Sequence, residues 1–132
     1  MGWRSGSTAP SPDRLSTHPQ PFPIKGKGET SKMTLILAGS IRIAPECLAE
    51  LRPHLAAQVE GSRGEPGCLA YALSEDPLDP GLIRVFEHFT DAAALEFHRA
   101  SPHMAAWRAA CAALGVHERR MSSFDVSDYR EI

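Results

Sequence analysis

Residues 33–132 predict one α+β domain, and three observations support this fold class. The chain has 132 residues, 42% of them apolar, which is the length and composition of a single hydrophobic core. Runs of β-forming residues alternate with segments of helical spacing, in the order strand, helix, strand, strand, helices, strand. The first strand is apolar on both alternating sets of residues, which is typical of a sheet covered on both sides.

The first 32 residues differ from the rest in composition. They hold five of the eleven prolines with several glycines and serines, and their apolar residues follow no period. Such a segment buries too little apolar surface to offset its ordering entropy, so we expect residues 1–32 to be a disordered leader. Met33 then opens the first β-forming run, and the codons for residues 27–29 must be purine-rich, as in bacterial ribosome-binding sites. This gives the hypothesis that the native protein starts at Met33.

The first strand is predicted over residues 34–43, and a helix follows it. Pro45 suits the first position of a helix. Leucines then recur at helical spacing up to a stop at Gly61, and Pro53 inside this segment predicts a kink.

The second half of the domain begins with a predicted hairpin. Residues 65–67 turn the chain into a strand at about 68–74, and a dense group of turn formers at 76–81 precedes a strand at 82–89. Thr90 with Asp91 is a good helix start, and Ser101 before Pro102 is another. That last helix should end at Gly115, before a final strand at about 116–126.

The order βαββαβ is that of the ferredoxin-like fold, an antiparallel sheet with helices on one face. The other face of the sheet then needs a cover, because its strands are apolar on both sides. The sequence therefore predicts a homodimer in which two sheets pack face to face.

Charge and cysteine content exclude several classes of protein. Beyond the leader the chain has nine Lys and Arg against fourteen Asp and Glu, so a nucleic-acid partner is not expected. The three cysteines are odd in number and widely spaced, which predicts no disulfide framework and fits a reducing cytoplasm. No stretch approaches the apolar length of a membrane helix, so no membrane partner is expected.

Several motifs in this order resemble one known family. They are E-P-G-C at residues 65–68, F-E-H-F-T-D at 86–91, A-L-x-x-H at 94–98, and S-P-H-M at 101–104 followed by Trp107. This pattern is similar to that of the antibiotic-biosynthesis (quinol) monooxygenases, and it covers essentially all of residues 33–132. The resemblance implies a dimeric α/β barrel, and it implies a reaction among several: cofactor-free oxidation of quinols and polyketides by O₂, isomerisation of a phospho-sugar, or heme degradation. Heme degradation is disfavoured, because the first strand lacks an Asn and Phe89 stands where that branch has Trp.

Three residues are candidates for proton transfer. Glu87 interrupts an apolar row on the third strand, and His98 and His103 lie on the helical segments that fold back over the sheet. Either imidazole is expected to hydrogen-bond Glu87, which would make the pair a base for a phenol or hydroquinone. The alternative is a buried pair that only holds helix to sheet, and His103 has the further alternative of a simple helix-start residue.

Four more residues are candidates for the wall of a substrate pocket: Tyr71, Phe89, Met104 and Trp107. Their aromatic and thioether side chains suit a planar apolar ligand. The helical spacing of Met104 and Trp107 is most simply explained by core packing, and Tyr71 has the alternative of packing within the sheet.

No metal or cofactor is expected from the sequence. His98 and His103 are five residues apart, off the i, i+4 spacing that places two ligands on one helix face. A glycine-rich phosphate loop after a strand is also absent from the sequence. The leading hypothesis is a cofactor-independent monooxygenase of a small aromatic hydroquinone or polyphenol, with O₂ as co-substrate. A cofactor-free isomerase and a non-catalytic small-ligand binder are the alternatives.

Overall fold

The computed structural model describes residues 33–132, so the expected leader at 1–32 lies outside the described residues. The folded unit spans Thr34–Val126, and the segment Ser127–Ile132 does not belong to it and has no helix or strand. The elements of the folded unit follow in the expected order: β1 (Thr34–Arg42), the short 3₁₀ helix η2 (Pro45–Cys47), α1 (Leu48–Arg63), β2 (Cys68–Glu75), β3 (Leu82–Phe89), α2 (Ala92–Arg99), α3 (Pro102–Leu114) and β4 (His117–Val126).

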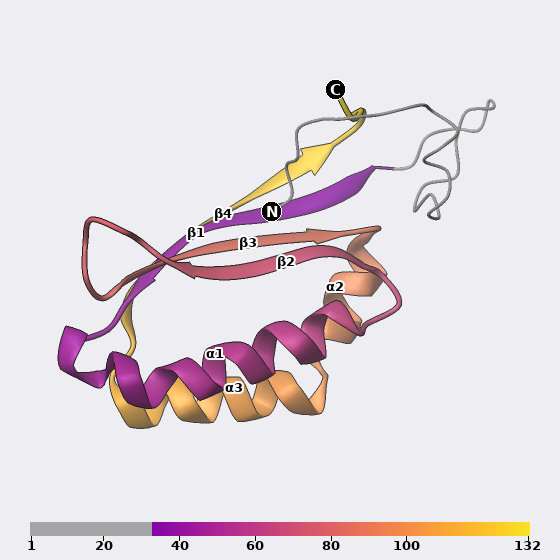
Figure 1. The fold of residues 1–132 in the computed structure, drawn as a ribbon. Coiled ribbons are helices and arrows are strands. Elements are labelled where there is room, and N and C mark those ends of the chain that lie inside the picture. Colours follow the sequence, from indigo (N-terminus) through magenta and orange to yellow (C-terminus); the bar gives the residue numbers. More distant parts are fainter. Residues whose placement is uncertain (1–32) are drawn as a thin grey trace. The chain divides into compact units, whose positions relative to one another are not determined.

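The four strands form one antiparallel sheet in the order β2-β3-β1-β4, which confirms the ferredoxin-like α+β fold (Figure 1). β1 lies between β3 and β4, so its backbone is hydrogen-bonded on both sides. In this register Glu87 of β3 stands between Leu37 of β1 and Tyr71 of β2. Because side chains alternate along a strand, these three side chains share one face of the sheet.

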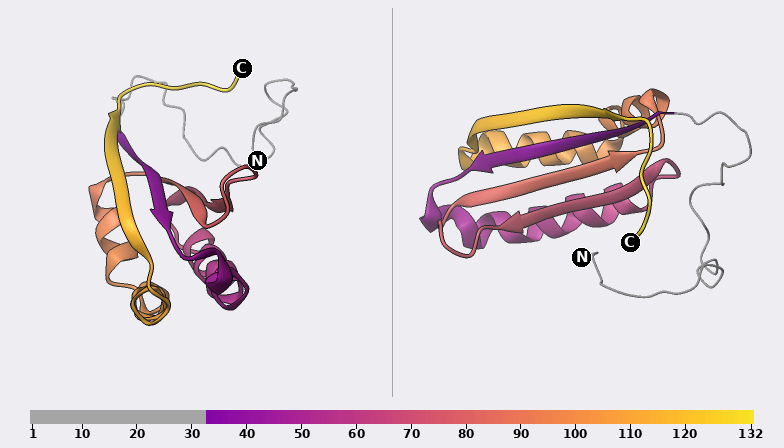
Figure 2. Two further views of the ribbon diagram at one scale, coloured as in Figure 1. Left: turned by 90° about the vertical axis from the view of Figure 1, so that its left-hand side faces the viewer. Right: turned by 90° about the horizontal axis from the view of Figure 1, so that it is seen from above.

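The helices cover one face of the sheet, with α1 and α3 side by side and α2 at the end of β3 (Figure 2). Their ends follow local rules. The Asp91 side chain caps α2 by accepting a hydrogen bond from the Ala94 N–H at 2.8 Å. α3 ends at Gly115, whose φ of 81° is left-handed and therefore favours glycine.

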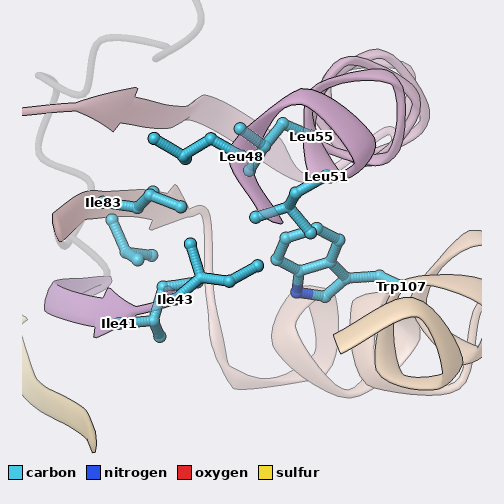
Figure 3. Packing of buried hydrophobic residues seen from close by; sticks show 8 residues of the cluster. Ile41, Ile43, Leu48, Leu51, Leu55, Ile83 and Trp107 are labelled. Atoms are coloured by element: carbon cyan, nitrogen blue, oxygen red, sulfur yellow. The ribbon is translucent and has the colours of Figure 1, made fainter. Parts of the chain in front are cut away.

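The main hydrophobic core lies between α1, α3 and the sheet (Figure 3). Leu51 of α1 and Ile83 of β3 are completely buried there, and the indole of Trp107 from α3 lies next to Leu51. A smaller apolar cluster of Leu37, Tyr71 and Phe89 lies under the other part of the sheet. The polar site described below borders this smaller cluster.

Leu51→Ala tests the main core. Leu51 is completely buried, so its truncation should lower the free energy of unfolding by about 2–5 kcal/mol through lost burial and a residual cavity. The matched control is Leu78→Ala, because Leu78 is 91% exposed and should change stability by no more than about 0.5 kcal/mol. Urea denaturation of both variants measures the difference, and equal losses would contradict the described packing.

Candidate active site

A buried carboxylate, Glu65, lies in the turn that joins α1 to β2. Its N–H donates to the Ser62 carbonyl at 3.1 Å, and its carbonyl accepts from the Cys68 N–H at 3.2 Å. The same turn is attached to the end of β3, because the Thr90 N–H donates to the Gly67 carbonyl at 2.9 Å. These backbone hydrogen bonds fix the position of the turn that carries Glu65. The side chain of Glu65 is 4% exposed, so its carboxylate is removed from water.

Two imidazoles converge on this carboxylate. Nδ1 of His98 lies 2.9 Å from Oε2 of Glu65 and 3.2 Å from Oε1. Nε2 of His103 lies 2.6 Å from the same Oε2. An ionised carboxylate only accepts hydrogen bonds, so both ring nitrogens donate to it.

A break between two helices brings the histidines together. His98 lies in the last turn of α2 and His103 in the first turn of α3, and Ser101 between them is the extended N-cap residue of α3. The Ser101 hydroxyl donates to the His98 carbonyl at 2.7 Å and lies 3.1 Å from Nε2 of His103. The His103 ring packs on α1 where Gly61 has no side chain, since a Cβ there would be 2.6 Å from the ring.

His98 is 1% exposed, and the centroid of its ring lies 5.4 Å from that of Tyr71 and 5.0 Å from that of Phe89. In the neutral ring that donates Nδ1–H to Glu65, Nε2 is an acceptor. This Nε2 is buried and accepts no hydrogen bond from the described residues. A buried acceptor with no partner is uncommon and marks the atom for a role beyond packing.

The expected hydrogen bond between Glu87 and His98 or His103 is wrong. Both imidazoles are bonded to Glu65 instead, and no described residue hydrogen-bonds the Glu87 carboxylate. Strand alternation correctly placed Glu87 on the helix-facing side, where it is 9% exposed. Periodicity carries no information on how the turn between α1 and β2 folds, and this turn places Glu65 next to both imidazoles.

Burial raises the pKa of Glu87 to about 7, although Arg119 and Arg99 act in the opposite direction and Glu65 adds to the rise. Glu87 is thus a second acid on the same face of the sheet, next to Tyr71 in the register. Glu87 takes no part in the Glu65 hydrogen bonds, and its role in proton transfer stays a prediction.

The four expected pocket residues are divided between the two apolar clusters. Phe89 and Tyr71 contact His98, and Gln58 Nε2 donates to the Tyr71 hydroxyl at 3.0 Å and to the Met104 sulfur at 3.2 Å. Burial and the charge of Glu87 raise the pKa of Tyr71. Trp107 belongs to the main core instead. Their roles toward a substrate stay predictions.

His98 and His103 lie on two different helices, so their spacing in the sequence does not decide whether they converge. Their ring nitrogens lie with a Glu65 oxygen inside one cluster whose atoms are all within 4.8 Å of one another. The expectation of no bound metal stays a prediction. Glu65 was also the functional candidate that sequence reasoning missed. Glu65 is the first residue of the E-P-G-C motif, whose proline and glycine indicate a turn but not a functional carboxylate.

Comparisons with known proteins identify the class. The family model of the antibiotic biosynthesis monooxygenases matches residues 34–110, so this chain belongs to that family. The match includes Glu65, His98 and His103.

Individual relatives agree with this assignment. A candidate monooxygenase of Mycobacterium tuberculosis is 38% identical over 65 residues, covering 49% of this chain and 63% of the relative. An uncharacterized protein of Synechocystis is 32% identical over 69 residues, or 52% of this chain and 47% of that protein. The chain therefore spans less than two thirds of these curated relatives. A crystal structure of a candidate antibiotic biosynthesis monooxygenase from Deinococcus radiodurans has a TM-score of 0.68 and 28% identity, covering 74% of this chain and 97% of that one.

Among residues 33–132, no helix has the length and apolar character needed to cross a membrane.

The pH dependence of stability tests the environment of Glu87. Its pKa is about 7 in the folded chain against an ordinary 4.5, so the folded state binds more protons between these values. Stability should therefore fall as pH rises through this window, by about 2–3 kcal/mol between pH 5 and pH 8 from this group. Glu87→Gln should remove that component, so the variant gains stability relative to the wild type as pH rises. Urea denaturation at both pH values measures it, and parallel pH curves for the two proteins would contradict the shifted pKa.

Proposed function

We propose that this protein is a monooxygenase that oxidises a small aromatic hydroquinone or polyphenol with O₂, using His98 as general base and Glu65 as its positioning residue. Membership of the monooxygenase family supports the type of reaction. The single observation that carries the proposal is the hydrogen bond of 2.9 Å between His98 Nδ1 and Glu65, beside a buried Nε2 that has no partner within residues 33–132.

The dyad is suited to removing a proton from a phenolic hydroxyl. A carboxylate that holds Nδ1–H fixes the tautomer and stabilises the imidazolium that forms when Nε2 accepts the proton. His103 donates to the same carboxylate at 2.6 Å, and this second bond restrains the orientation of Glu65.

The deprotonated hydroquinone is the electron donor in this proposal. Its anion passes one electron to O₂, and the semiquinone and superoxide then combine at a ring carbon. Loss of water leaves one oxygen atom of O₂ on the ring and gives the hydroxyquinone. The substrate supplies all the electrons, so the balance requires no further reductant. Apolar neighbours such as Phe89 favour the proton transfer by keeping water from the anion.

Entry to His98 requires a local movement. Nε2 is closed off from solvent, while the side chain of His103 is 23% exposed at the outer side of the cluster. The substrate therefore reaches Nε2 only when a neighbouring ring, Tyr71 or Phe89, moves aside.

An oxygen electrode with menadiol-type hydroquinones tests the reaction. The wild type should consume O₂ above the rate of autoxidation, and His98→Ala should lower kcat by about 100-fold to 10,000-fold through loss of the base. Glu65→Gln should also lower kcat, because the amide no longer fixes the tautomer. His54→Ala is the control, since His54 is an exposed histidine of α1 and should leave the rate unchanged.

Each outcome bears on a different part of the proposal. Uptake by the wild type at the autoxidation rate would refute an oxygenase acting on quinols and favour the isomerase or binding alternatives. Full activity in His98→Ala would refute the base assignment even if the reaction exists.

We also propose that two copies pair through the sheet face opposite the helices. Phe86 of β3 and Phe124 of β4 lie on that face and are 39% and 51% exposed in the single chain. Large apolar side chains exposed on one face are typical of an interface.

A cytoplasmic location also stays a proposal, supported by three free cysteines.

Sedimentation velocity tests the homodimer. The wild type should sediment as a dimer at micromolar concentration, and Phe86→Asp with Phe124→Asp should shift it to a monomer because a charge on the face opposes burial. Leu78→Asp is the control, as Leu78 is exposed in the β2–β3 loop and lies away from the sheet face. A monomeric wild type would refute the proposal.

A further inference from the structure

The Glu65 cluster has the donor set of a transition-metal site. Two imidazole nitrogens and one carboxylate oxygen lie within 4.8 Å of one another, on side chains that come from three different segments. Two histidines with one carboxylate form a common ligand set for Zn²⁺, and the same set binds Fe²⁺ in oxygenases.

The distances fit a metal with little rearrangement. Zn²⁺ binds His nitrogen and carboxylate oxygen at about 2.0–2.2 Å, so tetrahedral ligands are separated by about 3.3 Å. The observed separations of Glu65 Oε2 from the two ring nitrogens are 2.9 and 2.6 Å. The carboxylate oxygen therefore needs to move away from each ring nitrogen by less than about 1 Å. The two ring nitrogens lie within 4.8 Å of each other, so they need to approach by at most about 1.5 Å. Side-chain rotations can provide both movements.

The charge of the cluster also favours a cation. Glu65 is 4% exposed, and within the described residues its carboxylate is bonded to the two histidines and to no Lys or Arg. A buried carboxylate is stabilised by a compensating charge, and the only described groups bonded to this one are the two imidazoles. A divalent ion at this position supplies that charge.

A fourth ligand position and an access route are present on one side. The Ser101 hydroxyl lies 3.1 Å from His103 Nε2, near enough to bind the ion or a water molecule on it. His103 is 23% exposed while His98 is 2% exposed at its side chain, so an ion reaches the cluster past His103.

We propose that Glu65, His98 and His103 form a site for a divalent transition-metal ion, for which Zn²⁺ is the probe, and that the ion and the free base are alternative states of His98. A metal on Nδ1 takes the position of the Nδ1 proton, which moves to Nε2 of the neutral ring. Nε2 then becomes a donor and no longer accepts a proton. The binding step stands on the geometry alone, whereas its inhibitory effect rests on the proposed function.

The first experiment measures binding without reference to activity. The full chain, without an affinity tag and stripped with a chelator, is titrated with Zn²⁺ in competition with a chromophoric chelator. The wild type should bind an equimolar amount, and His103→Ala and Glu65→Gln should each weaken binding by about 100-fold or more, since even outer-shell changes cost 10-fold to 100-fold. His54→Ala and His117→Ala are matched controls on exposed histidines and should bind like the wild type.

Folding is checked by circular dichroism, and His103→Ala is the safer variant because His103 is only half-buried. No binding by the wild type, or binding that survives both His103→Ala and Glu65→Gln, would overturn the metal site.

The second experiment observes the tautomer. Nitrogen-15 NMR of labelled histidine should assign the proton of His98 to Nδ1 in the stripped protein and to Nε2 after Zn²⁺ is added. An unchanged His98 tautomer in the Zn²⁺-bound protein would overturn the switch. If the quinol oxidase activity exists, equimolar Zn²⁺ should abolish O₂ uptake and a chelator should restore it. Uptake that is unaffected by bound Zn²⁺ would overturn the inhibition, while a complete lack of activity would count against the proposed function and leave the binding result intact.

Discussion

Glu65 is a buried acid whose carboxylate is bonded to two imidazoles, and these bonds offset the cost of removing it from water. Its two imidazole partners come from the last turn of α2 and the first turn of α3, and its own turn is attached to the end of β3. This carboxylate therefore joins four elements at one end of the domain. The position of His98, its tautomer and the placing of α3 all depend on these contacts, so the site and the local fold share one set of hydrogen bonds.

Polar and apolar burial are separated along the helices. The main core around Leu51 and Trp107 is apolar and supplies stability through packing. The buried side-chain atoms that have no partner among the described residues belong to Gln58, Ser62 and His98, around the other, smaller cluster. Unsatisfied buried groups reduce stability, and in native proteins they often accompany function. In this domain, the packing around Leu51 and Trp107 offsets the stability lost at these unpartnered polar atoms.

The sequence was sufficient for the strands and helices but not for the site. Alternation and helical spacing depend on one element at a time, which is why the β2–β3 hairpin, the Asp91 cap and the Gly115 stop were predictable. The same alternation placed Glu87 on the correct face of β3. The partner of His98 depends instead on how the α1–β2 turn packs against the α2–α3 junction. No periodic pattern in the sequence predicts the distance between Glu65 and His98 across these two segments. In the sequence, Glu65 stands before a proline and a glycine, which indicate a turn and give no sign of its partners.

Gly61 has a consequence for how this domain can be altered. Glycine inside a helix costs roughly 1 kcal/mol relative to alanine, and α1 accepts this cost in its last turns so that the His103 ring can lie against its backbone. Helix strength and imidazole placement thus compete at a single position. Selection for thermal stability alone would favour alanine at this position. The helix would be more stable, but the new methyl group would displace the His103 ring from Glu65.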